Sequence, residues 1–262
     1  MRVRLIFLLN NRGACIPFHH QYLLSNLVTE LKTELSDEFK EYGLYTFSGV
    51  KGQTKVGRDG LHYYSSRVTV VFTSPNEKFV DEILKALFKR STVKLGEMEV
   101  VPESVEKENY TEFAESMKYI CISPLVLAGP NTVEEINTNF INPFDDLFSD
   151  YLYESTMIRM EASGLYTDED FQSFFKFQVV PDKEYLTKTI DKAKKFSRIY
   201  SSRYQNMPID VRGYTLPLTL YAHPKVQQFV FQCGFGEFAN SGFGMLDIAN
   251  MNPIGRSEPY TF

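Results

Sequence analysis

The order of strand and helix patterns in the N-terminal part of this chain limits the possible folds more than any other feature. Four segments are rich in β-branched and aromatic residues, which is typical of strands: 3–9, 44–50, 61–73 and 93–101. Two segments place apolar side chains three or four residues apart, which predicts helices: 19–35 and 76–90. Asn76 is expected to cap the second helix. The order β-α-β-β-α-β predicts a ferredoxin-like domain.

The second part of the chain repeats this pattern less clearly. Strand patterns are found at 118–127, 174–180, 185–190, 196–204 and 244–248. Asn142 followed by Pro143 predicts that a helix begins there and continues to residue 160. A second helix is hardest to place, because the segment 214–224 is short and contains Pro217. We therefore predict an α+β fold of two tandem ferredoxin-like domains.

The domain boundary is expected where the charge pattern changes. Residues 97–115 carry many acidic side chains and one basic side chain, Lys107. Domain boundaries fall in exposed polar segments, so the boundary is placed within 108–116. The predicted domains are residues 1–112 and residues 113–262.

Composition indicates a globular chain with a local rather than a general attraction for nucleic acid. Hydrophobic residues make up 43% of the 262 residues and charged residues 23%, so a packed core is expected. The formal net charge of −5 argues against a general nucleic-acid binder. It leaves room for a basic groove, since a partner responds to the nearby field.

The sequence shows no spacing typical of metal ligands. The three cysteines form no CxxC pair, and the four histidines form no HExxH motif. No metal or cofactor is therefore predicted. The N-terminal apolar run is too short for a signal peptide or a membrane span, so we expect a cytoplasmic protein with reduced thiols and no membrane partner.

Two stretches carry a local surplus of basic residues: 51–67 and 183–203. Aromatic residues are interleaved in the second stretch, and basic and aromatic side chains together suit single-stranded RNA. A solvated surface above core aromatics is the alternative interpretation. The residues predicted to contact RNA phosphates are Lys51, Lys55, Arg58, Lys194, Lys195 and Arg198.

The segment GFGEFANSGFG at 234–244 concentrates glycine in two GxG triplets. A simple turn is one explanation, and a loop whose free amides bind an anion is the other. Phe235 and Phe243 would anchor the two arms. The residues predicted to hold RNA backbone are Gly234, Gly236, Gly242 and Gly244. We expect Gly236→Val to abolish RNA binding without loss of the fold.

This segment matches the G-h-G-x5-G-h-G signature, where h is hydrophobic, and the chain thereby resembles a known family. The family is the CRISPR-associated endoribonuclease, of the RAMP superfamily, that cuts precursor CRISPR RNA within its repeats. IPFHHQYLLSNLV at 16–28, ISPLVL at 122–127 and GFGMLDI at 242–248 resemble further family segments. The resemblance implies RRM-like domains, repeat RNA as the partner, and metal-independent cleavage that leaves 2′,3′-cyclic phosphate and 5′-OH ends.

The resemblance departs from the family pattern at the catalytic position. A histidine is usual just after the first helix, but SDEFKEYGLYTFS at 36–48 contains none. Lys40 and Tyr42 occupy that region, and His20 matches the family's H-Q-Y segment. These three are the candidates for the chemistry, while a histidine bonded locally at a helix start is the alternative for His20.

Three functions stay open at this point. The first is the endoribonuclease, and the second is a non-catalytic member that binds repeat RNA. The third is a structural RNA-binding subunit of a CRISPR effector complex. Effector-complex proteins and a second copy of this chain are further candidate partners.

Overall fold

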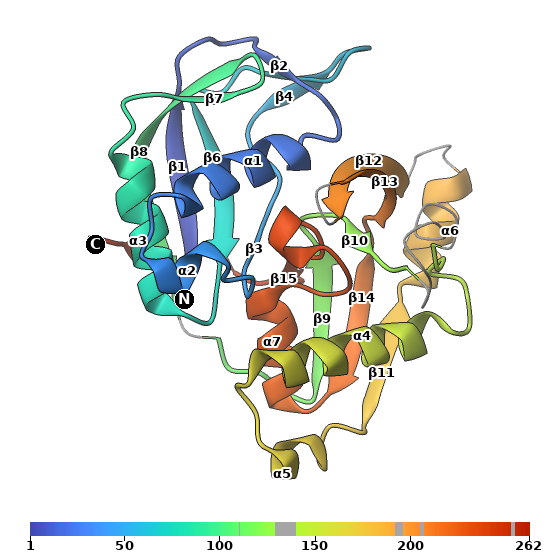
Figure 1. Cartoon of the computed structure of the whole chain (residues 1–262). Coiled ribbons are helices and arrows are strands. Elements are labelled where there is room, and N and C mark those ends of the chain that lie inside the picture. Colours follow the sequence, from blue (N-terminus) through green and yellow to red (C-terminus); the bar gives the residue numbers. More distant parts are fainter. Residues whose placement is uncertain (110, 129–139, 192–195, 205–206, 253–254) are drawn as a thin grey trace. The chain divides into compact units, whose positions relative to one another are not determined.

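The chain divides into two compact units in a computed structural model that describes all residues except 110, 129–139, 192–195, 205–206 and 253–254 (Figure 1). The first unit comprises 1–110, 240–242 and 252–262, and the second comprises 111–239 and 243–251. The predicted boundary between residues 112 and 113 lies close to residue 110, where the chain first leaves the first unit. The sequence analysis does not predict that residues 240–242 and 252–262 belong to the first unit again. No described helix combines the length and the apolar character needed to cross a membrane.

The first unit is built on one antiparallel sheet with the strand order β16-β8-β1-β6-β3, to which β7 adds beside β8. Its strands are β1 (Arg2–Leu9), β3 (Thr46–Phe47), β6 (Arg67–Thr73), β7 (Val93–Leu95), β8 (Met98–Glu108) and β16 (Ser257–Pro259). Its helices are α1 (Gln21–Lys32), α2 (Asp37–Lys40) and α3 (Glu77–Phe88). In chain order, β1-α1-β3-β6-α3-β8 is the predicted β-α-β-β-α-β arrangement.

The core of the first unit follows from the sequence pattern. Alternate residues of β1, such as Val3 and Phe7, are buried, as expected for a strand with one face against the core. Phe79 and Ile83 of α3 belong to the same core. The predicted cap is confirmed, because the Asn76 side chain accepts a hydrogen bond from the Phe79 amide at 3.1 Å.

A small second sheet in the first unit has the order β2-β5-β4. It consists of β2 (Cys15–Ile16), β4 (Thr54–Val56) and β5 (Leu61–Tyr63). β4 and β5 form a hairpin within the glycine-rich, basic stretch of the sequence. The hairpin therefore presents part of the predicted basic surface on a defined scaffold.

The second unit has a sheet with the order β11-β14-β9-β15. The elements in chain order are β9 (Ser116–Cys121), α4 (Phe148–Ser163), β11 (Phe177–Pro181), β14 (Pro217–Ala222), α7 (Pro224–Cys233) and β15 (Leu246–Ile248). This again is β-α-β-β-α-β, so the prediction of two tandem ferredoxin-like domains is confirmed.

Further elements are inserted into this second unit. β10 (Leu125–Val126), β12 (Ser197–Tyr204) and β13 (Met207–Tyr214) form a separate sheet in the order β10-β13-β12. Its short helices are α5 (Asp168–Phe171) and α6 (Lys183–Asp191), and the 3-10 turn η1 (Ala239–Ser241) lies where the chain passes from the second unit to the first.

The predicted helix start at Asn142 is wrong. The Asn142 side chain accepts from the amide of Phe144 at 3.1 Å, and Asp145 accepts from the amide of Leu147 at 2.9 Å. Each is an Asx turn, which offers the backbone an alternative to the helix. α4 therefore begins later, at Phe148.

Two further element predictions in the second unit are wrong. Residues 185–190 lie in α6 and not in a strand, since the Asp182 side chain accepts from the amide of Tyr185 at 2.9 Å and favours a helix start. The segment 214–224 forms β14, and the second helix is α7. Pro224 stands in the first turn of α7, where its missing amide hydrogen costs nothing.

Candidate functional site

The glycine-rich segment 234–244 forms a loop that is packed into the protein. Phe235 and Phe243 are 0% and 1% exposed, so both arms are anchored as predicted. The φ angles of its four glycines lie between 66° and 84°, a region that side chains rarely adopt. A Cβ at Gly244 would lie 1.8 Å from the Phe235 carbonyl oxygen, and one at Gly242 would lie 2.1 Å from the Phe47 ring. Packing therefore requires glycine here.

Three amides of this loop are not the free donors that the sequence interpretation predicts. The Phe235 amide donates to the Gly244 carbonyl at 2.8 Å, and the Gly244 amide donates to Pro124 at 2.7 Å. The Glu237 amide donates to the Val126 carbonyl at 2.8 Å. These bonds fix the loop's shape from within.

The expectation that Gly236→Val leaves the fold intact is also corrected. Gly236 has a φ of 75°, and a Cβ there would lie 2.4 Å from the Val126 carbonyl oxygen. Any larger side chain must displace the backbone of a buried strand. Loss of RNA binding in this variant would therefore not separate a ligand contact from loop damage.

Arg159 of α4 contacts the glycine loop through three hydrogen bonds, and the sequence analysis does not predict this role. Its guanidinium donates to the carbonyls of Gly234 at 2.9 Å, Gly236 at 3.0 Å and Cys233 at 2.6 Å. It also lies 5.5 Å from the centre of the Phe229 ring. Burial lowers the pKa of Arg159. The only sequence signal was a basic residue within an otherwise mixed helix pattern.

A second contact from α4 reinforces this arrangement. The Ser155 hydroxyl donates to a carboxylate oxygen of Glu237 at 2.6 Å. Ser155 and Arg159 stand four residues apart and so occupy the same face of the helix. One face of α4 therefore holds the first arm of the glycine loop.

His20 lies at the start of α1 and is buried. Its Nδ1 lies 3.0 Å from the Pro17 carbonyl oxygen, and its Nε2 accepts from the Val50 amide at 3.1 Å. Burial lowers the pKa of His20, which keeps the ring neutral. The neighbouring Gln21 donates to the Gly242 carbonyl at 3.4 Å. This contact joins the start of α1 to Gly242, which belongs to the same unit.

Lys40 and Tyr42 lie at and just after the end of α2, in different surroundings. Lys40 is exposed, and its ammonium lies 2.6 Å from a carboxylate oxygen of Asp37. The Tyr42 ring packs on Phe79, with ring centres 4.7 Å apart. The Tyr42 hydroxyl accepts from the Ser74 hydroxyl at 3.4 Å. Tyr42 therefore has a fixed position, whereas the end of Lys40 reaches solvent.

Lys32 in the last turn of α1 is a second residue that the sequence reasoning missed. Its ammonium donates to the Tyr42 carbonyl at 2.9 Å and lies 5.5 Å from the centre of the Tyr45 ring. Burial lowers the pKa of Lys32, an effect opposed by the charge of Glu41. A partly buried lysine beside Tyr42 adds a second cation to the region where the predicted catalytic residues lie.

The predicted phosphate contacts on the first basic stretch are exposed. Lys51 pairs by its backbone with Thr69 beside the main sheet, Lys55 lies on β4, and Arg58 lies in the turn after it. The Lys55 ammonium lies 5.0 Å from the centre of the Tyr64 ring, which is itself exposed. A cation and an open aromatic face thus occur together on this hairpin.

The second basic stretch is described only in part. Lys194 and Lys195 lie outside the described residues, and Arg198 is exposed on β12. Tyr200 of the same strand is buried, with its ring centre 5.7 Å from that of Phe243. Tyr200 is therefore a core aromatic residue and not an exposed surface for RNA bases. Its strand packs on the glycine loop through Phe243.

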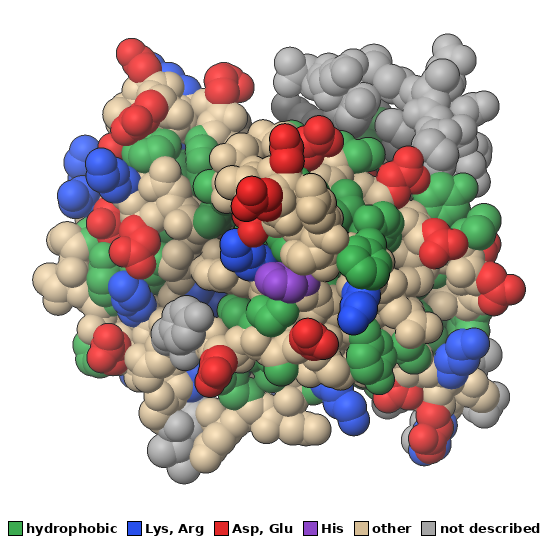
Figure 2. Space-filling model, turned by 90° about the horizontal axis from the view of Figure 1, so that it is seen from below, with side chains coloured by type: hydrophobic (Ala, Val, Ile, Leu, Met, Phe, Trp, Pro, Cys, Tyr) green, Lys and Arg blue, Asp and Glu red, His purple; other side chains and the backbone are tan. Residues whose placement is uncertain are grey.

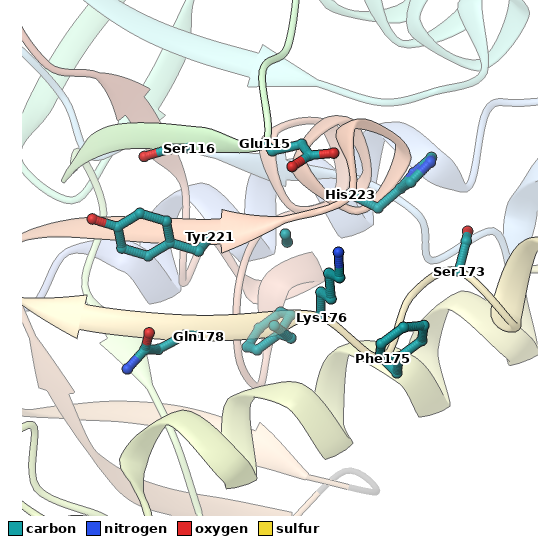
Figure 3. A pocket seen from close by; sticks show the side chains of 10 residues that line it. Glu115, Ser116, Ser173, Phe175, Lys176, Gln178, Tyr221 and His223 are labelled. Carbon is teal, nitrogen blue, oxygen red and sulfur yellow. The ribbon is translucent and has the colours of Figure 1, made fainter.

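A cavity of about 740 Å³ opens in the second unit at the ends of β9, β11 and β14 (Figure 3). Figure 3 shows Glu115, Lys176 and His223 at one end and Tyr221 and Gln178 at the other. None of the predicted site residues lines this cavity. Acidic and basic side chains are interspersed over the described part of the face in Figure 2, which does not favour a single strongly basic groove there.

Three described side chains, Cys15, Asp59 and His62, lie close enough together to share a metal ion. This cluster contains none of the predicted site residues.

Comparisons with known proteins agree with the fold and the glycine loop. The family model "CRISPR associated protein Cas6, C-terminal" matches residues 104–248. An endoribonuclease-like protein Cas6 of Pyrococcus furiosus is 22% identical over 95% of this chain and 98% of its own length. CRISPR-associated endoribonuclease Cas6 1 of Methanocaldococcus jannaschii is 23% identical over 88% of this chain and 86% of its own.

A solved structure has the same fold. It is described as a RAMP protein binding different RNA substrates, with a TM-score of 0.77 and 19% identity. The match covers 95% of this chain and 99% of that one. The two tandem domains are therefore arranged along this chain as they are along a RAMP protein.

Proposed function

This chain belongs to the Cas6 family of CRISPR-associated, repeat-RNA-processing proteins, and on that premise we propose that it cleaves precursor CRISPR RNA within its repeats. The observation that carries the proposal is the family match over residues 104–248, which contains the whole glycine loop. One relative named as endoribonuclease-like and one named as an endoribonuclease support it over 95% and 88% of the chain.

We propose that the reaction needs no metal ion. A base takes the proton of the ribose 2′-OH, whose oxygen then attacks the adjacent phosphate. The bond from phosphorus to the 5′-oxygen breaks and an acid protonates that oxygen, so that 2′,3′-cyclic phosphate and 5′-OH ends result. Such a reaction needs a base, a cation near the phosphorane and an acid. In this proposal the ammonium of Lys40 stabilises the charge of the phosphorane, and the hydroxyl of Tyr42 takes part in proton transfer. His20, whose ring nitrogens are both occupied, acts by positioning the segment at Val50.

The RNA backbone is assigned to the exposed basic residues in the same proposal. These are Lys51, Lys55, Arg58 and Arg198, together with Lys194 and Lys195. The exposed ring of Tyr64 offers a surface on which a base can stack. Gly234, Gly236, Gly242 and Gly244 shape the loop that RNA contacts. The logarithm of the binding constant falls as the logarithm of the salt concentration rises. Each phosphate contact that is lost should make this negative slope shallower by about 0.7 to 1.

Labelled repeat RNA incubated with the protein in EDTA tests this function. A discrete cut whose product carries a cyclic phosphate is expected. Lys40→Ala should slow the cut by at least about tenfold, because general catalysis by one side chain contributes about 10²- to 10⁴-fold. Lys94→Ala is the matched control, since Lys94 is also an exposed lysine paired with a carboxylate, that of Glu99.

A non-catalytic repeat-RNA binder is the second candidate. It is favoured by the lack of a histidine in 36–48 and by the two hydrogen bonds that occupy the His20 ring. A gel shift with intact RNA after long incubation would support this candidate. If the protein neither shifts nor cuts the RNA, both candidates are contradicted.

A further inference from the structure

The small sheet β2-β5-β4 brings together three side chains that are widely separated in the sequence. β2 pairs with β5 so that Cys15 stands directly opposite His62. Asp59, in the turn between β4 and β5, places a carboxylate oxygen 3.0 Å from Nε2 of His62. Together with the Cys15 sulfur, these ligand atoms all lie within 4.8 Å of one another. We propose that Cys15, Asp59 and His62 form a binding site for Zn²⁺.

The orientation of His62 suits a metal ligand. Its Nδ1 lies 3.2 Å from the carbonyl oxygen of Gly13, and a carbonyl can only accept, so Nδ1 carries the hydrogen. Nε2 faces Asp59, whose carboxylate also can only accept, so a metal bound at Nε2 would replace the hydrogen that Nε2 donates there. Histidines that bind metals commonly donate their other ring N–H to a backbone carbonyl in this way, which fixes the ring and its tautomer.

Two glycines keep the space around the cluster open. A Cβ at Gly57 would stand 2.6 Å from Nε2 of His62 and 2.7 Å from the Asp59 carboxylate. A Cβ at Gly60 would stand 2.9 Å from the Cys15 sulfur and 2.2 Å from the Ile16 carbonyl oxygen. A methyl group at either position would occupy space beside the ligand atoms.

The set of donors indicates the metal. Thiolate, imidazole and carboxylate are the three ligand types that Zn²⁺ combines in proteins, and a site with three of them keeps a fourth position for water. Zinc–ligand bonds of about 2.0 to 2.3 Å place tetrahedral ligand atoms about 3.3 to 3.8 Å apart. The distance from His62 Nε2 to the Asp59 oxygen, 3.0 Å, is slightly shorter than this, and every other separation within the cluster is at most 4.8 Å. Asp59 is exposed, so rotation of its side chain can adjust its distances to the half-buried Cys15 and His62.

The charge around the cluster also favours a cation. The negative charges of Asp59 and Glu97 both act on the side chains of Cys15 and His62. A divalent cation would offset these negative charges and stabilise the thiolate. Bound metal would also tie the β4–β5 turn to β2 and so hold the turn that carries Arg58.

Cobalt(II) provides the first test because its spectrum reports the ligands. Untagged full-length protein titrated with Co²⁺ should develop a sulfur-to-cobalt charge-transfer band and tetrahedral d–d bands that excess Zn²⁺ removes. Cys15→Ser should abolish the charge-transfer band. Asp59→Asn and His62→Gln should weaken Zn²⁺ binding by more than about tenfold. Changing a residue that only hydrogen-bonds to a metal ligand already costs about tenfold or more, and these two residues are proposed to bind the metal directly. His19→Gln, a histidine outside the cluster, should bind like the unaltered chain.

Alkylation of the unaltered protein provides a second test that does not depend on a variant folding. Cys121 and Cys233 are buried, and burial raises their pKa values to about 11 and about 12. Iodoacetamide at neutral pH should therefore label Cys15 first, and Zn²⁺ should slow that labelling at least tenfold. A cobalt spectrum without a sulfur band, or labelling of Cys15 that Zn²⁺ leaves unchanged, would overturn the proposal.

Discussion

Gly244 and Gly164 have similar positive φ angles in two different surroundings. Their φ angles are 66° and 64°, but a Cβ at Gly244 meets the Phe235 carbonyl at 1.8 Å, while one at Gly164 meets nothing within 4 Å. Gly164→Ala should lower the free energy of unfolding by about 1 kcal/mol, the cost of the left-handed conformation. Gly244→Ala should lower it by at least about 3 kcal/mol, because overpacking adds to that cost.

Urea denaturation of the two variants measures this difference. Equal losses would show that the glycine loop tolerates a side chain at Gly244 and would contradict the packing explanation. The comparison therefore separates the two explanations of the motif that the sequence left open.

His20 should make the stability of the protein depend on pH. Burial lowers its pKa from the ordinary value of 6.5, so below pH 6.5 the unfolded chain binds a proton that the folded chain does not. The free energy of unfolding then falls as the pH falls, by at most about 1.4 kcal/mol per pH unit. His20→Gln should remove this contribution, so the variant should show a shallower slope below pH 6.5 in denaturation measured at several pH values. Identical slopes in both proteins would contradict a buried neutral His20.

At the scale of elements, α4 holds the glycine loop through the fork of Arg159. Arg159→Lys keeps the charge but loses the paired nitrogens that reach three carbonyls. A loss of about 2 to 4 kcal/mol in the free energy of unfolding is expected, since hydrogen bonds to charged groups contribute about 1.5 to 3 kcal/mol each. The same substitution at Arg67, an exposed partner of Glu103, should cost at most about 1 kcal/mol. Similar losses at both positions would contradict the role of Arg159.

The elements that the sequence predicted well are those whose core face shows in a regular period. β1 and α3 have such faces, and the Asn76 cap is a local bond that a sequence pattern can reveal. The start of α4 was missed because side-chain turns at Asn142 and Asp145 compete locally with the helix.

The site was less predictable because its contacts join distant segments. Arg159 meets the glycine loop only once α4 is packed, so a helix pattern cannot reveal its role. Cys15 and His62 become neighbours only through the pairing of β2 with β5. Ligand spacing along the chain therefore gave no sign of their cluster.

At the scale of the whole chain, the last residues complete the sheet of the first unit. β16 pairs with β8 at the edge of the sheet, and Arg256 lies 3.1 Å from the carboxylate of Glu108, which is buried. Arg2 also contacts Glu108, at 2.8 Å. Tyr260 donates to Asp81 of α3 at 2.8 Å. The tail therefore shares a buried charge cluster and a sheet edge with the first unit.

Deleting residues 252–262 should destabilise the first unit and spare the second. The deletion exposes the edge of β8 and removes Arg256, one of the cations that compensate the buried Glu108 carboxylate. Leaving a buried charge without any partner costs about 3 to 5 kcal/mol. The cost here should be smaller, because Arg2 still contacts Glu108. Hydrogen exchange followed by mass spectrometry should show faster exchange in peptides from β8 and unchanged exchange in peptides from β9 and β14. Arg256→Gln should give the same pattern more weakly, whereas Glu258→Gln, at an exposed position of β16, should not. Equal acceleration in both units would mean that the tail stabilises the chain as one cooperative body, because unfolding of the first unit would then carry the second with it.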